Sequence, residues 1–166
     1  YCIERWTMKA LSSHEVLAHS VVRIDDRTLL DADLSEQVIQ LLLHDGERWD
    51  GAQCEEGRLR NVYECLEENL GNRFGSALED FVVENATASQ IREQRVKSFF
   101  ERRIEQDKRR LQTLRQTNPE SRVLRATEGR LRKAIENRDD KLREIRQRSE
   151  PEVEKSTVAA GIFRVV

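Results

Sequence analysis

The chain has 166 residues, 37% of them hydrophobic and 36% charged. Because charged residues make up about 25% of an average globular domain, this composition supplies one modest core and excludes a large globule. Two prolines and seven glycines argue against disorder and against a β fold with many turns. Residues 1–90 hold 8 Lys and Arg against 18 Asp and Glu, whereas residues 91–150 hold 19 against 11. We therefore expect an acidic body and a basic arm.

Cysteine usage favours a reduced, cytoplasmic protein. Cys2, Cys54 and Cys65 are odd in number and form no Cys-x-x-Cys pair, so a disulfide framework is the weaker interpretation. The longest apolar runs are far too short to cross a bilayer, and no signal-peptide pattern occurs, so we predict no membrane partner. The chain opens on Tyr1, inside a strand-like run and without Met, and we interpret it as a piece of a longer protein.

Period-two alternation predicts two antiparallel strands at the start of the chain. In residues 1–11, Cys2, Trp6 and Met8 fall on one face, and only Glu4 interrupts that apolar face. Residues 16–24 are β-branched and apolar, and the turn cluster Ser-Ser-His-Glu precedes them. A lone hairpin is barely stable, so these strands are expected to pack on helices or on further strands.

Two helices follow the strands. The first is predicted over residues 34–45, with Asp33 or Ser35 as its cap and Gly46 just beyond its end. After a loop, an apolar stripe with steps of three and four predicts a long helix from about Arg58. Gly71 and Gly75 interrupt this stripe, and we expect a kink there or a point where another element packs closely.

From residue 91 the apolar stripe narrows to a coiled-coil seam. Asn118-Pro119 is predicted to end the long helix and to begin a second one, with Asn118 as its cap. The connection is short, so the two helices should pack antiparallel. The predicted seam consists of Glu93, Lys97, Phe100, Ile104, Asp107, Leu111 and Leu114 on the first helix and of Leu124, Glu128, Leu131, Ile135, Arg138, Leu142 and Ile145 on the second.

These elements define a fold class and a domain division. Pro151 ends the second helix, and the apolar segment 157–166 is predicted to return to the sheet as a strand. We predict an α+β fold, mainly α, in which a small antiparallel sheet and its helices carry a long protruding antiparallel helical hairpin. The body comprises residues 1–83 with strand 157–166, and the coiled-coil arm comprises residues 84–150 with its tip near 117–120.

Motifs for catalysis and for cofactor binding are absent from the sequence. It contains no Gly-x-x-x-x-Gly-Lys-[Ser/Thr] loop and no Gly-x-Gly-x-x-Gly, so no nucleotide site of either type is predicted. His14, His19 and His44 lack the spacing of metal ligands and have no neighbouring cysteine pair. We predict no catalytic residue, no bound cofactor and no metal site in this chain.

Basic side chains of the arm form the one strong functional signal. Five acid–base pairs at i,i+4 (Glu93–Lys97, Glu105–Arg109, Glu128–Arg132, Asp139–Arg143 and Glu144–Arg148) are interpreted as helix support. Other basic residues, Arg115 and Lys133 among them, have no acid four positions earlier. They form either a solvated face or a surface for phosphates or an acidic protein. The predicted contact residues are Arg102, Arg103, Lys108, Arg110, Arg122, Arg125 and Arg130.

Aromatic residues are scarce in the arm. Phe99 and Phe100 lie at its base, and none occurs from Glu101 to the tip. We therefore predict that bases do not stack on the arm between Glu101 and the tip and that any binding to DNA is non-specific.

The last half of the chain resembles a known family. The segment "RLQTLRQTNPESRVLRATEGRLRKAIENRDDKLREIR" (110–146), followed by an apolar terminal strand, is similar to the C-terminal region of bacterial Swi/Snf-type helicase-like ATPases, the RNA polymerase-associated type in particular. The resemblance covers residues 90–166. It rests on a basic helix, the Asn-Pro turn, a second helix with Leu131, Ile135 and Leu142, and the closing strand.

The resemblance implies a role for the chain within a larger protein. The parent would be an ATP-driven remodeller or translocase on duplex DNA, with ATP and Mg²⁺ bound by motor lobes upstream of this chain. The chain itself would be a non-catalytic accessory part that positions DNA or a partner such as RNA polymerase. No catalytic residue transfers, because no ATPase motif occurs here. The competing hypothesis is a stand-alone coiled-coil adaptor or structural protein with no nucleic-acid role.

Overall fold

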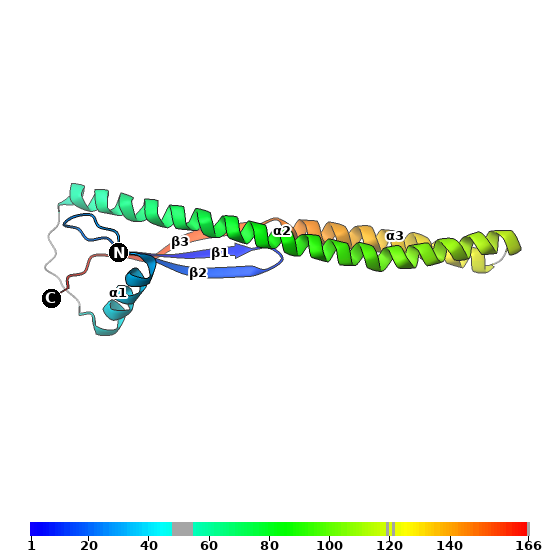
Figure 1. Ribbon diagram of the computed structural model, residues 1–166, viewed down its shortest axis with the longest axis horizontal. Helices are drawn as coiled ribbons and strands as arrows, with labels where there is room; N and C mark the ends of the chain where they lie inside the picture. The colour runs from blue at the N-terminus through cyan, green and yellow to red at the C-terminus, as the bar shows by residue number, and fades with distance from the viewer. Residues whose placement is uncertain (48–54, 119, 121, 166) are drawn as a thin grey trace. The chain divides into compact units, whose positions relative to one another are not determined.

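A computed structural model describes residues 1–47, 55–118, 120 and 122–165. The elements in these residues, shown in Figure 1, are β1 (Cys2–Lys9), β2 (Ser13–Ser20), α1 (Ala32–Asp45), α2 (Glu56–Thr117), α3 (Arg122–Ser149) and β3 (Glu152–Ala160). The fold is α+β and mainly helical, with a small antiparallel sheet, as predicted. The chain divides into two compact units. We call them the sheet unit (Tyr1–Lys9, Ser13–Val82 and Glu152–Val166) and the hairpin unit (Ala10–Ser12 and Val83–Pro151).

The sheet has the order β2-β1-β3, with both pairings antiparallel. The alternation predicted for β1 is confirmed, since Cys2, Trp6 and Met8 are buried. Glu4 is buried as well, although it is charged. Its carboxylate accepts a hydrogen bond from Trp6 Nε1 at 2.8 Å and lies 3.3 Å from Lys155 Nζ. Two strands therefore provide the partners that a buried carboxylate requires.

The predicted terminal strand 157–166 is wrong in its bounds, because β3 spans Glu152–Ala160. Its register runs from Lys9 opposite Glu152 to Cys2 opposite Ala160, so β3 begins directly after Pro151 and ends where β1 has no further residue to pair. Beyond it, the Gly161 N–H donates to the Tyr1 carbonyl at 3.1 Å. Among the apolar residues that suggested a longer strand, Phe163 packs against the Tyr1 ring, whereas Ile162 and Val165 are exposed.

Apolar clusters lie on both faces of the sheet. On one face, α2 contributes Val62, Leu66 and Leu70 to a cluster with Trp6 and Ala18. On the other face, Ile39 of α1 packs with Ile3 and Val21. Since successive strand residues point to opposite faces, one short strand supplies both clusters. The sheet unit is thus a three-layer structure of helix, sheet and helix.

The first helix begins earlier than the sequence indicated. Asp31 is the N-cap of α1, and its carboxylate accepts a hydrogen bond from the Leu34 N–H at 2.8 Å. Asp33 and Ser35 were the predicted caps, but both lie inside the helix, and Ser35 is buried with its hydroxyl bonded to the Leu30 carbonyl. Gly46 follows the last residue, as predicted. Its N–H donates to the Leu42 carbonyl, and a Cβ there would clash with that same oxygen.

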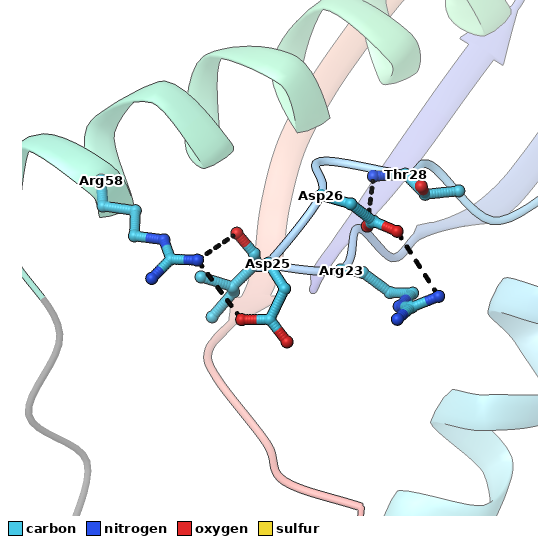
Figure 2. Close-up of polar contacts among 6 residues, drawn as sticks. Arg23, Asp25, Asp26, Thr28 and Arg58 are labelled. Carbon is cyan, nitrogen blue, oxygen red and sulfur yellow. Dashed lines mark hydrogen bonds and ion pairs between the residues drawn. The ribbon is translucent and has the colours of Figure 1, made fainter.

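Polar contacts organise the segment between β2 and α1 (Figure 2). The Thr28 N–H donates to Asp26 Oδ1 at 3.1 Å, and Arg23 forms an ion pair with Asp26. Arg58, near the start of α2, donates to the Ile24 carbonyl and to Asp25 Oδ1. These bonds fix a tight turn that ends in the bridge between Val22 and Leu29.

Gly71 and Gly75 are not points where another element packs closely, which was one of the two alternatives predicted for them. The helix α2 continues through both, and a Cβ built at either position would have no neighbour within 4 Å. The apolar residues around them already fix the helix against the sheet, so the low helix propensity of glycine is tolerated. The loop predicted between the first two helices falls largely on residues 48–54, which lie outside the described residues.

Within the hairpin unit, α3 runs antiparallel to the second part of α2 (Figure 1). Among the described residues, two ion pairs join the helices: Glu93 lies 3.2 Å from Arg146, and Arg115 lies 3.0 Å from Glu128. Of the predicted seam residues on both helices, all but Lys97 are buried or half-buried. The prediction that Lys97 lies in the seam is wrong. Its side chain is exposed and forms an ion pair with Glu93, and Val96 is half-buried in its place.

Two seam residues were missed by the sequence interpretation. Thr127 and Ala134 are buried, seven residues apart on α3. Their side chains are small, and the Thr127 hydroxyl returns a hydrogen bond to the Val123 carbonyl within the same helix. The second helix also begins at Arg122, later than the predicted Asn118-Pro119 start. Pro119 itself lies outside the described residues.

Asn85 is the polar centre at the base of the hairpin unit. Its side chain is buried, accepts a hydrogen bond from the Leu11 N–H at 3.2 Å, and donates to the Ser149 carbonyl at 2.7 Å. One amide group therefore connects the turn 10–12, the helix α2 and the last residue of α3.

Candidate functional site

The predicted contact residues are all exposed, but they do not form one surface. Arg102 and Arg103 border the same hollow on α2, and Arg110 follows Arg103 by seven residues on the same side of the helix. Lys108 is two residues from Arg110, which places it on nearly the opposite side of the helix. The other three, Arg122, Arg125 and Arg130, belong to α3, where Arg130 donates to the Thr127 hydroxyl.

Ion pairs differ from the predicted set in part. Glu93–Lys97, Glu105–Arg109 and Glu144–Arg148 form as predicted. Glu128 pairs with Arg115 across the hairpin in place of Arg132, so Arg115 has an acidic partner although no acid stands four positions before it in the sequence. The predicted Asp139–Arg143 pair does not form, because Arg143 pairs with Asp140 and Asp139 pairs with Arg138. Both corrections arise because a long side chain reaches partners that spacing along one helix does not reveal.

One face of α2 carries only positive charge. The helical repeat of 100° per residue places five arginines within about 100° of the helix circumference. Within the described residues, none of their side chains forms an ion pair or a hydrogen bond. The nearby acids are turned elsewhere: Glu93 and Asp107 are half-buried in the seam, and Glu101 falls on the far side. We call this surface the arginine face; it consists of Arg92, Arg95, Arg102, Arg103 and Arg110.

An aromatic side chain stands within the arginine face. The Phe99 side chain is 65% exposed, and it is flanked by Arg95, Arg102 and Arg103 at the i−4, i+3 and i+4 positions. An open hollow on the helix is lined by these residues together with Gln94, Ser98 and Gln106. The Phe100 ring, half-buried in the seam, contacts Phe99 edge to face with centroids 5.2 Å apart. The sequence shows this aromatic pair, but it does not indicate that the Phe99 side chain points outward.

Electrostatics also differ between the seam and the face. Hydrogen bonds from Lys97 and then from Arg146 lower the pKa of Glu93, so this carboxylate stays charged where the helices meet. The arginine face has no such acid to neutralise it. Its five guanidinium groups therefore present uncompensated charge to any anionic partner.

Other kinds of site find no support in the described part of the chain. Its His, Cys, Asp and Glu side chains nowhere gather in a group of three or more that could hold a metal ion. None of the described helices combines the length and the apolar character needed to span a bilayer. Of the three histidines, His14 and His19 lie five residues apart on β2 and His44 lies on α1.

Comparisons with protein-family models, curated proteins and solved structures find no match for this chain. The likeness to the Swi/Snf-type C-terminal region therefore stays a prediction based on its residues.

Proposed function

We propose that the chain is a non-catalytic accessory part of a nucleic-acid-acting protein and that its hairpin holds the phosphate backbone of DNA. The arginine face is the observation that carries this proposal. Guanidinium groups bind phosphate oxygens through two parallel hydrogen bonds, and neutralising phosphates releases the counterions around them. Five such groups, none of them in an ion pair within the described residues, provide the charge that this mode of binding needs.

The dimensions of the arginine face fit a duplex. Arg92 and Arg110 are 18 residues apart, which corresponds to about 27 Å along a helix. Duplex DNA advances about 3.4 Å per base pair, so a helix of this length could follow about eight base pairs. A side-by-side contact of this kind reads no base edges, because only the phosphates are within reach.

The proposed parent is an ATP-dependent helicase-like protein whose motor lobes lie outside this chain. The resemblance of residues 90–166 to the Swi/Snf-type C-terminal region supports that assignment, and RNA polymerase is the protein partner it suggests. ATP and Mg²⁺ would belong to the motor lobes. The free thiols Cys2 and Cys65 support a cytoplasmic location. Motor motifs in the full-length protein would test this part of the proposal, and the chain alone is expected to hydrolyse no ATP with or without DNA.

A salt titration of duplex binding tests the DNA contact. The purified chain should bind unrelated duplexes equally, with a dissociation constant at the weak end of about 10⁻⁴ to 10⁻⁶ M at physiological salt, because the acidic first half opposes approach. Replacing Arg102, Arg103 and Arg110 together by Gln should weaken binding. It should also reduce the slope of log K against log salt by about 0.9 for each phosphate that the variant no longer neutralises.

The chain offers a charge-matched control. Lys141, Arg143 and Arg148 also lie on exposed parts of the hairpin, but each has an acid partner on its own helix. Changing these three to Gln removes the same formal charge and should alter duplex binding less. Equal weakening in both variants would show that total charge, and not the arginine face, attracts DNA. No binding even at low salt would reject the DNA contact and favour the adaptor hypothesis.

A further inference from the structure

The exposure of Phe99 has no structural explanation within the hairpin unit. Between Ile91 and Val123 it is the only large apolar side chain that the described residues leave exposed. Phe100, the next residue, shows the alternative, because its ring turns into the seam. An apolar side chain that remains in water contributes no hydrophobic stabilisation to the fold. An isolated exposed Phe is common on protein surfaces, but this one stands in the middle of a face that otherwise carries arginines.

The geometry around Phe99 suits a planar ligand with negative charge on either side. Its ring is held at 90° to that of Phe100, so its orientation is fixed by a neighbour that the seam itself holds. In the described chain no cation lies over the Phe99 ring, whereas Lys155 lies 5.9 Å from the Phe74 centroid. Arg95, Arg102 and Arg103 surround the ring at helical neighbour positions, about 5–6 Å away at their Cβ atoms.

We propose that the arginine face binds single-stranded nucleic acid, with one unpaired base stacked on Phe99 and the adjoining phosphates held by Arg95, Arg102 and Arg103. The proposal rests on the nucleic-acid function above and specifies its substrate class. An aromatic platform inside a basic surface is the arrangement by which proteins bind single strands without reading sequence. A duplex engages the same arginines but not Phe99, because its bases are already stacked on one another. The hairpin would therefore bind a separated single strand differently from an intact duplex.

The proposal predicts a larger role for Phe99 in single-strand binding than in duplex binding. Stacking of one base strengthens binding by about 5- to 150-fold. Phe99→Leu keeps an apolar side chain but removes the aromatic ring, and its affinity for a 20-nucleotide oligo-dT should fall by a factor within that range. Phe99→Tyr keeps the ring and should bind like the wild type. Neither change should alter the affinity for a 20-base-pair duplex.

Three ligands and one control make the test decisive. Fluorescence anisotropy of labelled oligo-dT, oligo-rU and an oligonucleotide made of abasic sites separates base stacking from backbone charge. The wild type should bind both base-bearing strands better than the abasic strand, and Phe99→Leu should remove that difference. Val83→Ala changes another exposed apolar residue of α2, outside the arginine face, and should leave all affinities unchanged. A preference for oligo-dT or for oligo-rU supports the proposal equally and identifies DNA or RNA as the source.

The outcomes distinguish this inference from the proposed function. If Phe99→Leu binds oligo-dT as the wild type does, while the arginine triple variant no longer binds duplex, the stacking proposal fails and the DNA contact stands. If Phe99→Leu weakens duplex and single strand equally, Phe99 acts on the surface in general and the stacking proposal also fails. If the wild type binds none of the ligands at low salt, both proposals fail.

Discussion

The sheet unit and the hairpin unit bury their side chains in different ways. The sheet unit has apolar clusters on both faces of its sheet, and Leu70 and Ile39 are 0% exposed within them. The hairpin unit has a single line of contact between two helices, and this line includes the polar Thr127 and Asn85 and the half-buried Glu93 and Asp107. A thin seam with polar members contributes less burial free energy per residue than a closed core.

This difference has a functional consequence. A helix in the hairpin uses about one third of its circumference for the seam, so most of its surface is free to carry charge. That free surface is where the five arginines and Phe99 lie. The sheet unit has fewer such surfaces, because β1 and α2 contribute apolar residues to its clusters. We infer that stability resides mainly in the sheet unit and that binding resides mainly in the hairpin unit.

The largest effect is expected at the core of the sheet unit. Leu70→Ala should lower the free energy of unfolding by about 2–5 kcal/mol, because it removes a buried side chain and leaves a cavity. Leu111→Ala in the seam should lower it less, since the helices of the hairpin can close over the space. Chemical denaturation of both variants measures the difference. Leu43→Ala is the control, because Leu43 is exposed on α1 and should change stability by no more than about 0.5 kcal/mol. Equal destabilisation at Leu70 and Leu111 would break the comparison between the two units.

The next effect concerns the polar centre of the hairpin unit. Asn85→Ala leaves the Leu11 N–H and the Ser149 carbonyl without their partner, and an unsatisfied buried group costs about 1–3 kcal/mol. We expect faster hydrogen exchange at the Leu11 amide and earlier unfolding of the end of α3. Asn137→Ala changes the same residue type at an exposed position of α3 and should not destabilise the hairpin. Unchanged exchange at Leu11 would contradict the role assigned to Asn85.

A smaller effect of opposite sign is expected at the glycines of α2. Gly71→Ala and Gly75→Ala should each stabilise the protein by up to about 1 kcal/mol, because alanine favours the helix and its Cβ meets no neighbour at either position. Gly46→Ala is the counter-test, since its Cβ would clash with the Leu42 carbonyl, and it should destabilise α1. Thermal denaturation of the three variants distinguishes them, and a lower stability at Gly71 would imply a close neighbour that the structure does not contain.

Local patterns predicted much of this fold because burial follows simple periods. Alternation identified the buried face of β1, and heptads identified most of the seam. The bounds of β3 could not be predicted, because they depend on where β1 ends and not on the residues of β3 itself. Thr127 and Ala134 were missed because small side chains carry little hydrophobic signal, although they are buried where two helices meet. The outward orientation of Phe99 could not be predicted from residue spacing either, because it depends on which of the two neighbouring phenylalanines enters the seam.

The smallest expected effect is a pH dependence of the hairpin. The pKa of Glu93 is lowered from its ordinary value of 4.5 by hydrogen bonds from Lys97 and from Arg146. A carboxyl whose pKa is lowered by folding adds stability above its unfolded pKa and loses that contribution as the pH falls through its folded pKa. Lys97 and Arg146 are well exposed, and ion pairs of this kind contribute about 0.2–1 kcal/mol.

Unfolding of the hairpin unit, followed by hydrogen exchange between pH 3 and pH 7, should therefore become easier below about pH 4.5. Glu93→Gln should remove that component of the pH dependence. Arg146→Gln breaks the contact between the helices but keeps Lys97, whose hydrogen bond is the largest single cause of the shift, so part of the component should remain. If Arg146→Gln removes the dependence as fully as Glu93→Gln does, the cross-helix pair and not the Lys97 pair stabilises the charged carboxylate. The seam would then depend on charge at this position more than its apolar residues indicate.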